Sequence, residues 1–127
     1  MSYLVVFLGA GLGGAARHAV NIGAARLLGY GFPFGTLSVN VLGSLMMGLL
    51  AQAFVMRSGL PQELRLFLAT GLLGGFTTFS TFSLDIVSLW ERGQWGLAAT
   101  YVAVSLIASV AGLFLGLSLI RLSGPGG

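Results

Sequence analysis

The chain has 127 residues, of which 56% are hydrophobic and only 7% are charged, and its mean hydropathy is +0.97. About a quarter of the residues of a soluble domain are charged, so this composition excludes water as the main solvent of the chain. Six arginines and three acids in no basic cluster argue against nucleic-acid binding, and the lack of cysteine excludes disulfides and thiolate chemistry.

Four apolar segments follow one another, and each has the roughly 20 residues that a membrane-spanning helix needs. We place them at residues 3–28, 34–56, 64–89 and 95–120. The stretches at 29–33, 57–61 and 91–93 are short and contain glycine or proline, which predicts tight connections between antiparallel neighbours. Residues 121–127 are predicted to form a disordered tail. The sequence therefore predicts one all-α transmembrane domain of four helices.

Glycines four residues apart occur in three of the four segments. This spacing lets helix backbones approach closely within a membrane. The pairs are Gly9 and Gly13, Gly71 and Gly75, and Gly112 and Gly116. Because 21 glycines make chance pairs common, we interpret them as a sign of tight packing and not of a particular partner.

The third segment contains an unusual stretch at residues 71–83, with three glycines, five hydroxyl side chains and three phenylalanines. Glycine favours departures from helical geometry, and Thr and Ser can bond backbone groups that a departure leaves free. We therefore predict that the third helix breaks in mid-membrane, near Gly74 to Thr77. A β-carbon at Gly74 is expected to crowd the break. Unwound carbonyls there could hold a cation such as Na⁺, as broken helices do in transporters.

Polar side chains within the spans are expected to face protein or water, because an unpaired polar group is costly in hydrocarbon. They form stripes at helical spacing on three segments. The stripes are Thr36, Asn40 and Ser44; Thr77, Ser80 and Ser83; and Tyr101, Ser105 and Ser109. All can donate hydrogen bonds and none is negative, which favours a small anion over a cation. The positive edges of phenylalanine rings can also stabilise an anion, although Phe76, Phe79 and Phe82 could equally face lipid or the core.

The arginines give almost no preference for one orientation in the membrane. Arg57, Arg65 and Arg121 fall on one side of the predicted bundle, and Arg26 and Arg92 fall on the other. Arg17 joins Arg26 and Arg92 if its side chain reaches that side. Because arginine normally concentrates on the cytoplasmic side, this balance permits insertion in both directions and pairing with an inverted copy. A fixed orientation set by other signals is the alternative.

Three stretches resemble the Fluc (CrcB-type) fluoride channels. They are Gly-Thr-Leu-Ser-Val-Asn at 35–40, Thr-Gly-Leu-Leu-Gly-Gly-Phe-Thr-Thr-Phe-Ser-Thr-Phe-Ser at 70–83, and Trp-Glu-Arg-Gly at 90–93. The resemblance covers essentially the whole chain. It implies an antiparallel, dual-topology homodimer in the cell inner membrane, with two fluoride pores and a structural Na⁺ at the dimer centre. Such a channel exports cytoplasmic fluoride passively.

The resemblance also implies roles for individual residues. Phe79 and Phe82 would form an aromatic box in the pore, and Asn40 would contact the anion. Thr36, Ser80, Tyr101, Ser105 and Ser109 complete the expected polar lining. Backbone carbonyls of Gly74 and Thr77 would bind Na⁺, and Arg17 would line an aqueous vestibule. The family often has Glu where this chain has Asp85, so the role of that carboxylate is left open.

Other interpretations remain at this point. Asn40 could join helices, and Arg17 could extend its charge to the membrane surface. A small proton-coupled drug exporter would need a carboxylate within the membrane, for which Asp85 is the candidate, although the sequence offers it no partner. A purely structural subunit would tolerate changes at Asn40 and the phenylalanines. An enzyme is not expected, because no nucleophile and base occur at usable spacing, and no soluble protein partner is implied.

Overall fold

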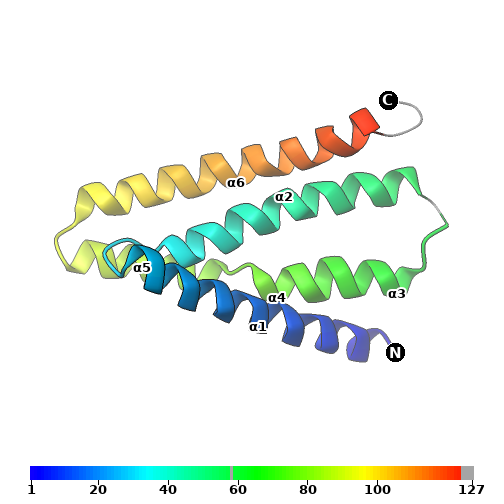
Figure 1. Cartoon of the computed structure of the whole chain (residues 1–127), viewed down its shortest axis with the longest axis horizontal. Coiled ribbons are helices and arrows are strands. Elements are labelled where there is room, and N and C mark those ends of the chain that lie inside the picture. Colours follow the sequence, from blue (N-terminus) through cyan, green and yellow to red (C-terminus); the bar gives the residue numbers. More distant parts are fainter. Residues whose placement is uncertain (58, 124–127) are drawn as a thin grey trace.

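The computed structural model describes residues 1–57 and 59–123, and the regular structure in this part of the chain is entirely helical. Four segments are long and apolar enough to cross a membrane: α1 (Ser2–Leu28), α2 (Phe34–Met56), a composite third segment (Gln62–Glu91) and α6 (Trp95–Ser123). Figure 1 shows them running alongside one another, with the start of α1 and the end of α6 at the same end of the bundle. The prediction of an all-α chain with four potential spans is confirmed.

Helix ends coincide with residues that cannot easily continue a helix. Gly29 follows α1 with φ of 80°, and Gly93 follows the third segment with φ of 75°, a conformation that favours glycine. Pro33 and Pro61 immediately precede α2 and α3 (Gln62–Arg65), where a proline is tolerated.

The C-terminal end of α6 corrects one prediction. The helix continues to Ser123, so residues 121–123 are helical and not part of a disordered tail. Arg121 explains this extension, because its Nε donates a hydrogen bond of 3.0 Å to Oε1 of Gln52 on α2. The rest of the predicted tail, residues 124–127, lies outside the described residues.

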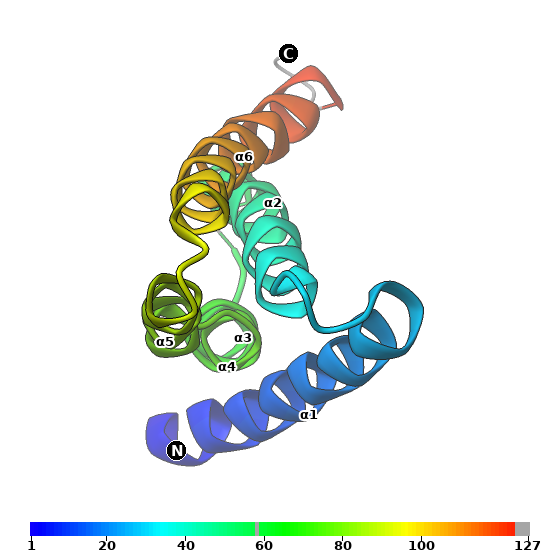
Figure 2. The same cartoon turned by 90° about the vertical axis from the view of Figure 1, so that its left-hand side faces the viewer.

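The third segment is interrupted, as predicted, but two residues later than the glycines suggested. It consists of α3, a π-helix η1 (Leu66–Leu73), α4 (Gly74–Phe76) and α5 (Phe79–Glu91). Thr77 and Thr78 separate α4 from α5 in extended conformations, with ψ of 159° and 123°. Figure 2 shows α5 displaced sideways from the line of α3 and α4. Gly74 is helical, so the break itself is made by the two threonines.

The glycines near the break serve close packing between α1 and the third segment. A β-carbon at Gly9 would lie 2.6 Å from the Phe67 carbonyl oxygen, and one at Gly71 would lie 3.1 Å from Cα of Gly9. On the other side of the bundle, a β-carbon at Gly116 of α6 would lie 2.7 Å from the Leu49 nitrogen of α2. These approaches show that the glycine pairs join helices of the same chain.

Gly75, rather than Gly74, is the position where a side chain would be crowded within this chain. A β-carbon at Gly75 would lie 2.9 Å from Cα of Ala10, whereas one at Gly74 would meet only the Ala69 carbonyl oxygen, at an ordinary 3.8 Å. The expectation of crowding at Gly74 is therefore wrong for contacts within the chain. The reason is that Gly74 faces outward, while Gly75 faces α1.

We predict that Gly75→Ala destabilises the folded chain by about 1–3 kcal/mol, because the added methyl group pushes α1 away from the break. Thermal stability in detergent, followed by the loss of a monodisperse chromatography peak, measures this effect. Gly11→Ala is the matched control, since no atom lies within 4 Å of a β-carbon there. Equal stability of the two variants would contradict the proposed packing role.

Candidate functional site

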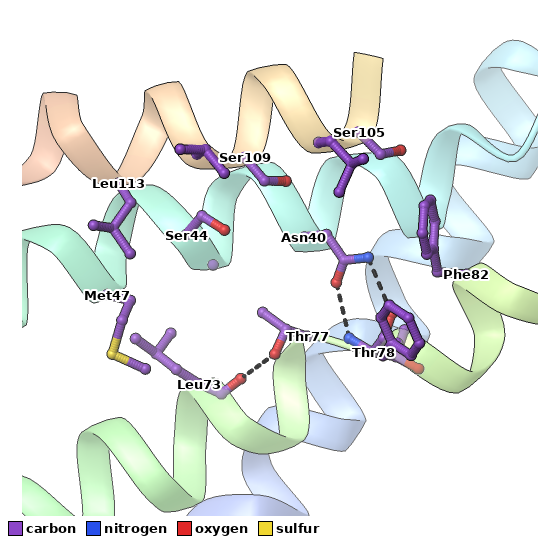
Figure 3. Close-up of a pocket in the computed structure, with 14 residues that line it drawn as sticks. Asn40, Ser44, Met47, Leu73, Thr77, Thr78, Phe82, Ser105, Ser109 and Leu113 are labelled. Atoms are coloured by element: carbon purple, nitrogen blue, oxygen red, sulfur yellow. Dashed lines mark hydrogen bonds between the residues drawn. The ribbon is translucent and has the colours of Figure 1, made fainter. Parts of the chain in front are cut away.

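Asn40 of α2 binds the interrupted backbone of the third segment directly. Its Nδ2 donates to the Thr78 carbonyl oxygen at 3.0 Å, and its Oδ1 accepts the Thr78 N–H at 2.8 Å (Figure 3). The Thr78 hydroxyl in turn accepts the Thr81 N–H at 3.2 Å and so caps α5. One amide thus replaces both hydrogen bonds that a continuous helix would have supplied to Thr78. The break is consequently a defined structure and not a loose loop.

A cavity of about 330 Å³ lies beside the break, between α2, the third segment and α6 (Figure 3). None of the described residues that line it is charged. Its polar members are Asn40, Ser44, Thr77, Thr78, Ser105 and Ser109, and its apolar members include Met47, Leu73, Phe79, Phe82 and Leu113. The cavity therefore combines neutral hydrogen-bond donors with aromatic and aliphatic walls.

Ser105 is the most informative polar group in this cavity. The residue is 5% exposed, and its Oγ is buried with no hydrogen-bond partner among the described residues. A buried hydroxyl without a partner is costly, because its interaction with water is lost and not replaced. A ligand in the cavity that accepts a hydrogen bond would satisfy it.

An aromatic group borders the cavity on the side of α5. The ring centroids of Phe79 and Phe82 are 5.8 Å apart, and those of Phe82 and Tyr101 are 5.1 Å apart. Phe82 and Tyr101 are buried, whereas Phe79 is 77% exposed on the surface of the single chain. The Tyr101 hydroxyl donates to Oδ2 of Asp85 at 2.9 Å. Asp85 therefore has a partner within the bundle, contrary to the expectation from the sequence.

The structure brings most of the predicted residues together but separates some. Asn40, Thr77, Phe79, Phe82, Ser105 and Ser109 line the cavity, and Tyr101 packs against Phe82. Thr36 lines a second cavity, and Arg17 lines neither of them. Ser80 is exposed at the start of α5, where its hydroxyl lies 3.4 Å from that of Thr78.

The third predicted stripe is not one continuous face. Thr77 precedes the break, and Ser80 and Ser83 follow it, so a single helical spacing does not apply to all three. Ser83 donates its hydroxyl to the Phe79 carbonyl oxygen at 3.0 Å. Sequence reasoning also missed Thr78, although a threonine directly before a helix is a common N-cap.

Two backbone carbonyls near the break lack the donor that a continuous helix would give them. Such a helix would pair the Gly74 carbonyl with the Thr78 N–H and the Thr77 carbonyl with the Thr81 N–H. Here the Thr78 N–H donates to Oδ1 of Asn40 instead, and the Thr81 N–H donates to the Thr78 hydroxyl. Gly74 is also exposed on the surface of the chain. Carbonyl oxygens of this kind can bind a hard cation.

The fold and this cavity together define a multi-pass helical membrane protein with an uncharged, donor-lined cavity beside a broken helix. Comparison with known proteins makes the assignment more specific. Residues 4–117 match the family described as CrcB-like protein, Camphor Resistance (CrcB), and the chain belongs to this family. The resemblance noted from residues 35–40, 70–83 and 90–93 is thereby confirmed.

Several relatives are similar over almost their full length. A protein of Methylobacterium sp. (strain 4-46) is 59% identical over 121 residues, which cover 95% of this chain and 97% of the relative. Proteins of Granulibacter bethesdensis and Rhodopseudomonas palustris (strain BisB5) are each 56% identical over 121 residues, covering 95% of this chain and 95% and 98% of the relatives. Each of the three is named a fluoride-specific ion channel FluC. The expectation that the chain is not an enzyme is confirmed by this assignment.

Proposed function

We propose that this protein is a passive, selective fluoride channel that lets cytoplasmic fluoride leave the cell across the inner membrane. The buried and unpartnered hydroxyl of Ser105, in a cavity that no described charged residue lines, is the structural observation that carries the proposal. The names of the full-length relatives support the choice of fluoride.

The chemistry of the cavity suits a small anion that has lost most of its water. The Ser105 hydroxyl offers a donor, and Ser109 and Ser44 bring further hydroxyl groups to the same space. The positive edges of the Phe79 and Phe82 rings can stabilise negative charge without presenting a cation that would hold the ion permanently. A passage that binds fluoride by several weak contacts lets the ion enter and also leave.

Two copies in opposite orientations would complete the passage, and each subunit would then contribute to two pores. In the single chain, the cavity walls Phe79, Leu106 and Val110 are 77%, 56% and 55% exposed, so the cavity is open to one side. A second copy would cover this side and exclude lipid. The balanced arginines at the two ends of the bundle support an antiparallel arrangement, because they favour neither orientation.

A structural Na⁺ at the centre of this dimer fits the carbonyls of Gly74 and Thr77. Both lack their helical donors, and Gly74 is exposed where a second copy could approach. When bound, Na⁺ would neutralise the partial negative charges of these oxygens and so hold the two subunits together. Arg17, half-buried on α1, would face the aqueous vestibule and raise the local anion concentration.

We predict that removing Na⁺ weakens the dimer. If Na⁺ is present at about 100 times its dissociation constant, its removal should cost ~2.7 kcal/mol, which is roughly a 100-fold weaker subunit association. Analytical ultracentrifugation in detergent, in NaCl and in the chloride of a large organic cation, measures the change. An identical dissociation constant in both salts would argue against the Na⁺ site.

Growth of bacteria in fluoride tests the proposed function in its cellular setting. A strain without a fluoride exporter should grow in fluoride-containing medium when it expresses this chain, and should fail with the empty vector. Asn40→Asp, expressed to the same level, should also fail, because it places a negative charge in the cavity. Equal growth of the empty-vector strain and the expressing strain would contradict fluoride export.

A further inference from the structure

The end of the bundle at which α2 finishes carries an excess of positive charge. Figure 1 shows the end of α2, the start of α3 and the end of α6 together there. Residues 50–57, 59–66 and 117–123 of this end contain three arginines and one acid, namely Arg57, Arg65, Arg121 and Glu63. Residues 24–36 and 85–97 of the opposite end contain two arginines and two acids, namely Arg26, Arg92, Asp85 and Glu91. The arginines alone are nearly balanced between the two ends, but the net charge is not.

Arg121 is held against one side of α2 by an amide. Its Nε donates a hydrogen bond of 3.0 Å to Oε1 of Gln52. A guanidinium has five N–H donors, so this bond leaves its two terminal nitrogen groups for other acceptors. Arg121 is exposed, and Leu119 and Leu122 on the same helix are 47% and 76% exposed. A positioned cation therefore lies beside apolar side chains that are open in the single chain.

Arg65 is held against the other side of α2 by an aromatic ring. Its guanidinium carbon lies 5.1 Å from the ring centroid of Phe54, a cation–π contact that occupies one face of the guanidinium. Gln52 and Phe54 are two residues apart, which corresponds to about 200° of rotation around a helix. The two arginines therefore flank α2 on opposite sides.

Glu63 does not cancel the charge of Arg65. The two residues are two positions apart on α3, and side chains with that spacing do not face each other on a helix. Both are exposed, as is Leu64 between them, by 38%. Arg65, like Arg121, thus combines a free cationic edge with a neighbouring apolar side chain.

We propose that this end of the bundle binds anionic phospholipid headgroups, with one lipid phosphate at Arg121 on one side of α2 and another at Arg65 on the other side. A guanidinium can donate two parallel hydrogen bonds to the oxygens of a phosphate, and arginines at a membrane surface attract anionic lipids. The exposed leucines beside the two arginines contact the acyl chains, which favours a lipid over a free phosphate. The proposal goes beyond fluoride export and does not depend on which ion the protein carries.

Native mass spectrometry of the full-length protein in detergent tests the proposal. The anionic probe is phosphatidylglycerol, and phosphatidylcholine with the same acyl chains is the zwitterionic comparison. The wild-type protein should bind phosphatidylglycerol more tightly. Arg65→Gln and Arg121→Gln should each weaken that binding roughly fivefold at one site, the factor that corresponds to ~1 kcal/mol for one arginine at an anionic surface. Equal binding of the two lipids by the wild-type protein would overturn the proposal.

Gln52→Glu is the sharper variant, because a carboxylate there can still accept the hydrogen bond from Arg121. The variant therefore keeps the contact between α2 and α6 while it places a negative charge beside the guanidinium. It should weaken phosphatidylglycerol binding as much as Arg121→Gln does. Unchanged binding in Gln52→Glu would remove the site at Arg121.

Two controls make the same charge changes at the opposite end of the bundle. Gln94→Glu adds an acid at an exposed position between α5 and α6, and Arg26→Gln removes an exposed arginine from α1. Both should leave phosphatidylglycerol binding unchanged. If they weaken it as much as Gln52→Glu and Arg121→Gln do, only the net charge matters and the proposed sites are wrong. Displacement of the lipid by millimolar inorganic phosphate would indicate a site for free anions and would overturn the assignment to a lipid.

Discussion

Phe82→Ile should reduce fluoride throughput roughly tenfold or more while the protein still folds. Isoleucine retains much of the apolar volume but removes the ring edge, and aromatic interactions of this kind contribute about 0.5–1.5 kcal/mol each beyond area burial. The ring of Phe82 touches both the exposed Phe79 and the buried Tyr101, with centroid distances of 5.8 and 5.1 Å. The change also removes the ring edge that would face the anion, and the loss of ~1.4 kcal/mol of anion stabilisation corresponds to a tenfold rate change.

Leu84→Ile is the matched control for this variant. Leu84 lies on the same helix, is 64% exposed and does not line the cavity, so its replacement should leave throughput unchanged. Fluoride efflux from vesicles gives the rates, and chromatography shows whether each variant is assembled. Wild-type efflux in an assembled Phe82→Ile protein would remove the aromatic ring from the mechanism.

Asn40→Asp should have the larger effect, a loss of roughly 10³-fold in fluoride throughput. One carboxylate oxygen can still accept the Thr78 N–H, but the donor to the Thr78 carbonyl is lost. The new charge also repels fluoride. Two like charges ~4 Å apart at an effective dielectric of ~20 repel by about 4 kcal/mol, which corresponds to that loss.

Ser44→Ala tests the cavity lining without disturbing the break in the third segment. Ser44 is one turn from Asn40 and lines the same cavity, but the break does not depend on its hydroxyl. Its removal should therefore reduce efflux only modestly. Similar rates for Asn40→Asp and Ser44→Ala, in proteins that both assemble, would show that Asn40 has no special place in the passage.

The features that could be predicted from the sequence depend on short-range patterns. The four spans follow from apolar runs that end at glycines and prolines, and their bounds differ from the observed helices by no more than three residues at either end. The interruption of the third helix follows from the density of glycine and hydroxyl residues in 71–83. These signals lie within single segments, so they need no knowledge of the neighbouring helices.

The features that were missed depend on contacts between distant segments. Gly75, and not Gly74, is the crowded glycine because it packs against Ala10. Thr78 is held outside the helix by Asn40, 38 residues earlier, which binds both of its backbone groups. The pairing of Tyr101 with Asp85 requires the tight connection between α5 and α6. Thr36 and Asn40 share a helix face, yet they line different cavities.

The most direct test of the central claim is ion efflux from liposomes that contain the purified protein, measured with ion-selective electrodes. Vesicles loaded with fluoride or with chloride would be compared at equal pH on both sides, so that no proton gradient can drive transport. The proposed channel predicts rapid release of fluoride and negligible release of chloride. Equal release of both anions, or release of neither from dimeric protein supplied with Na⁺, would contradict a selective fluoride channel.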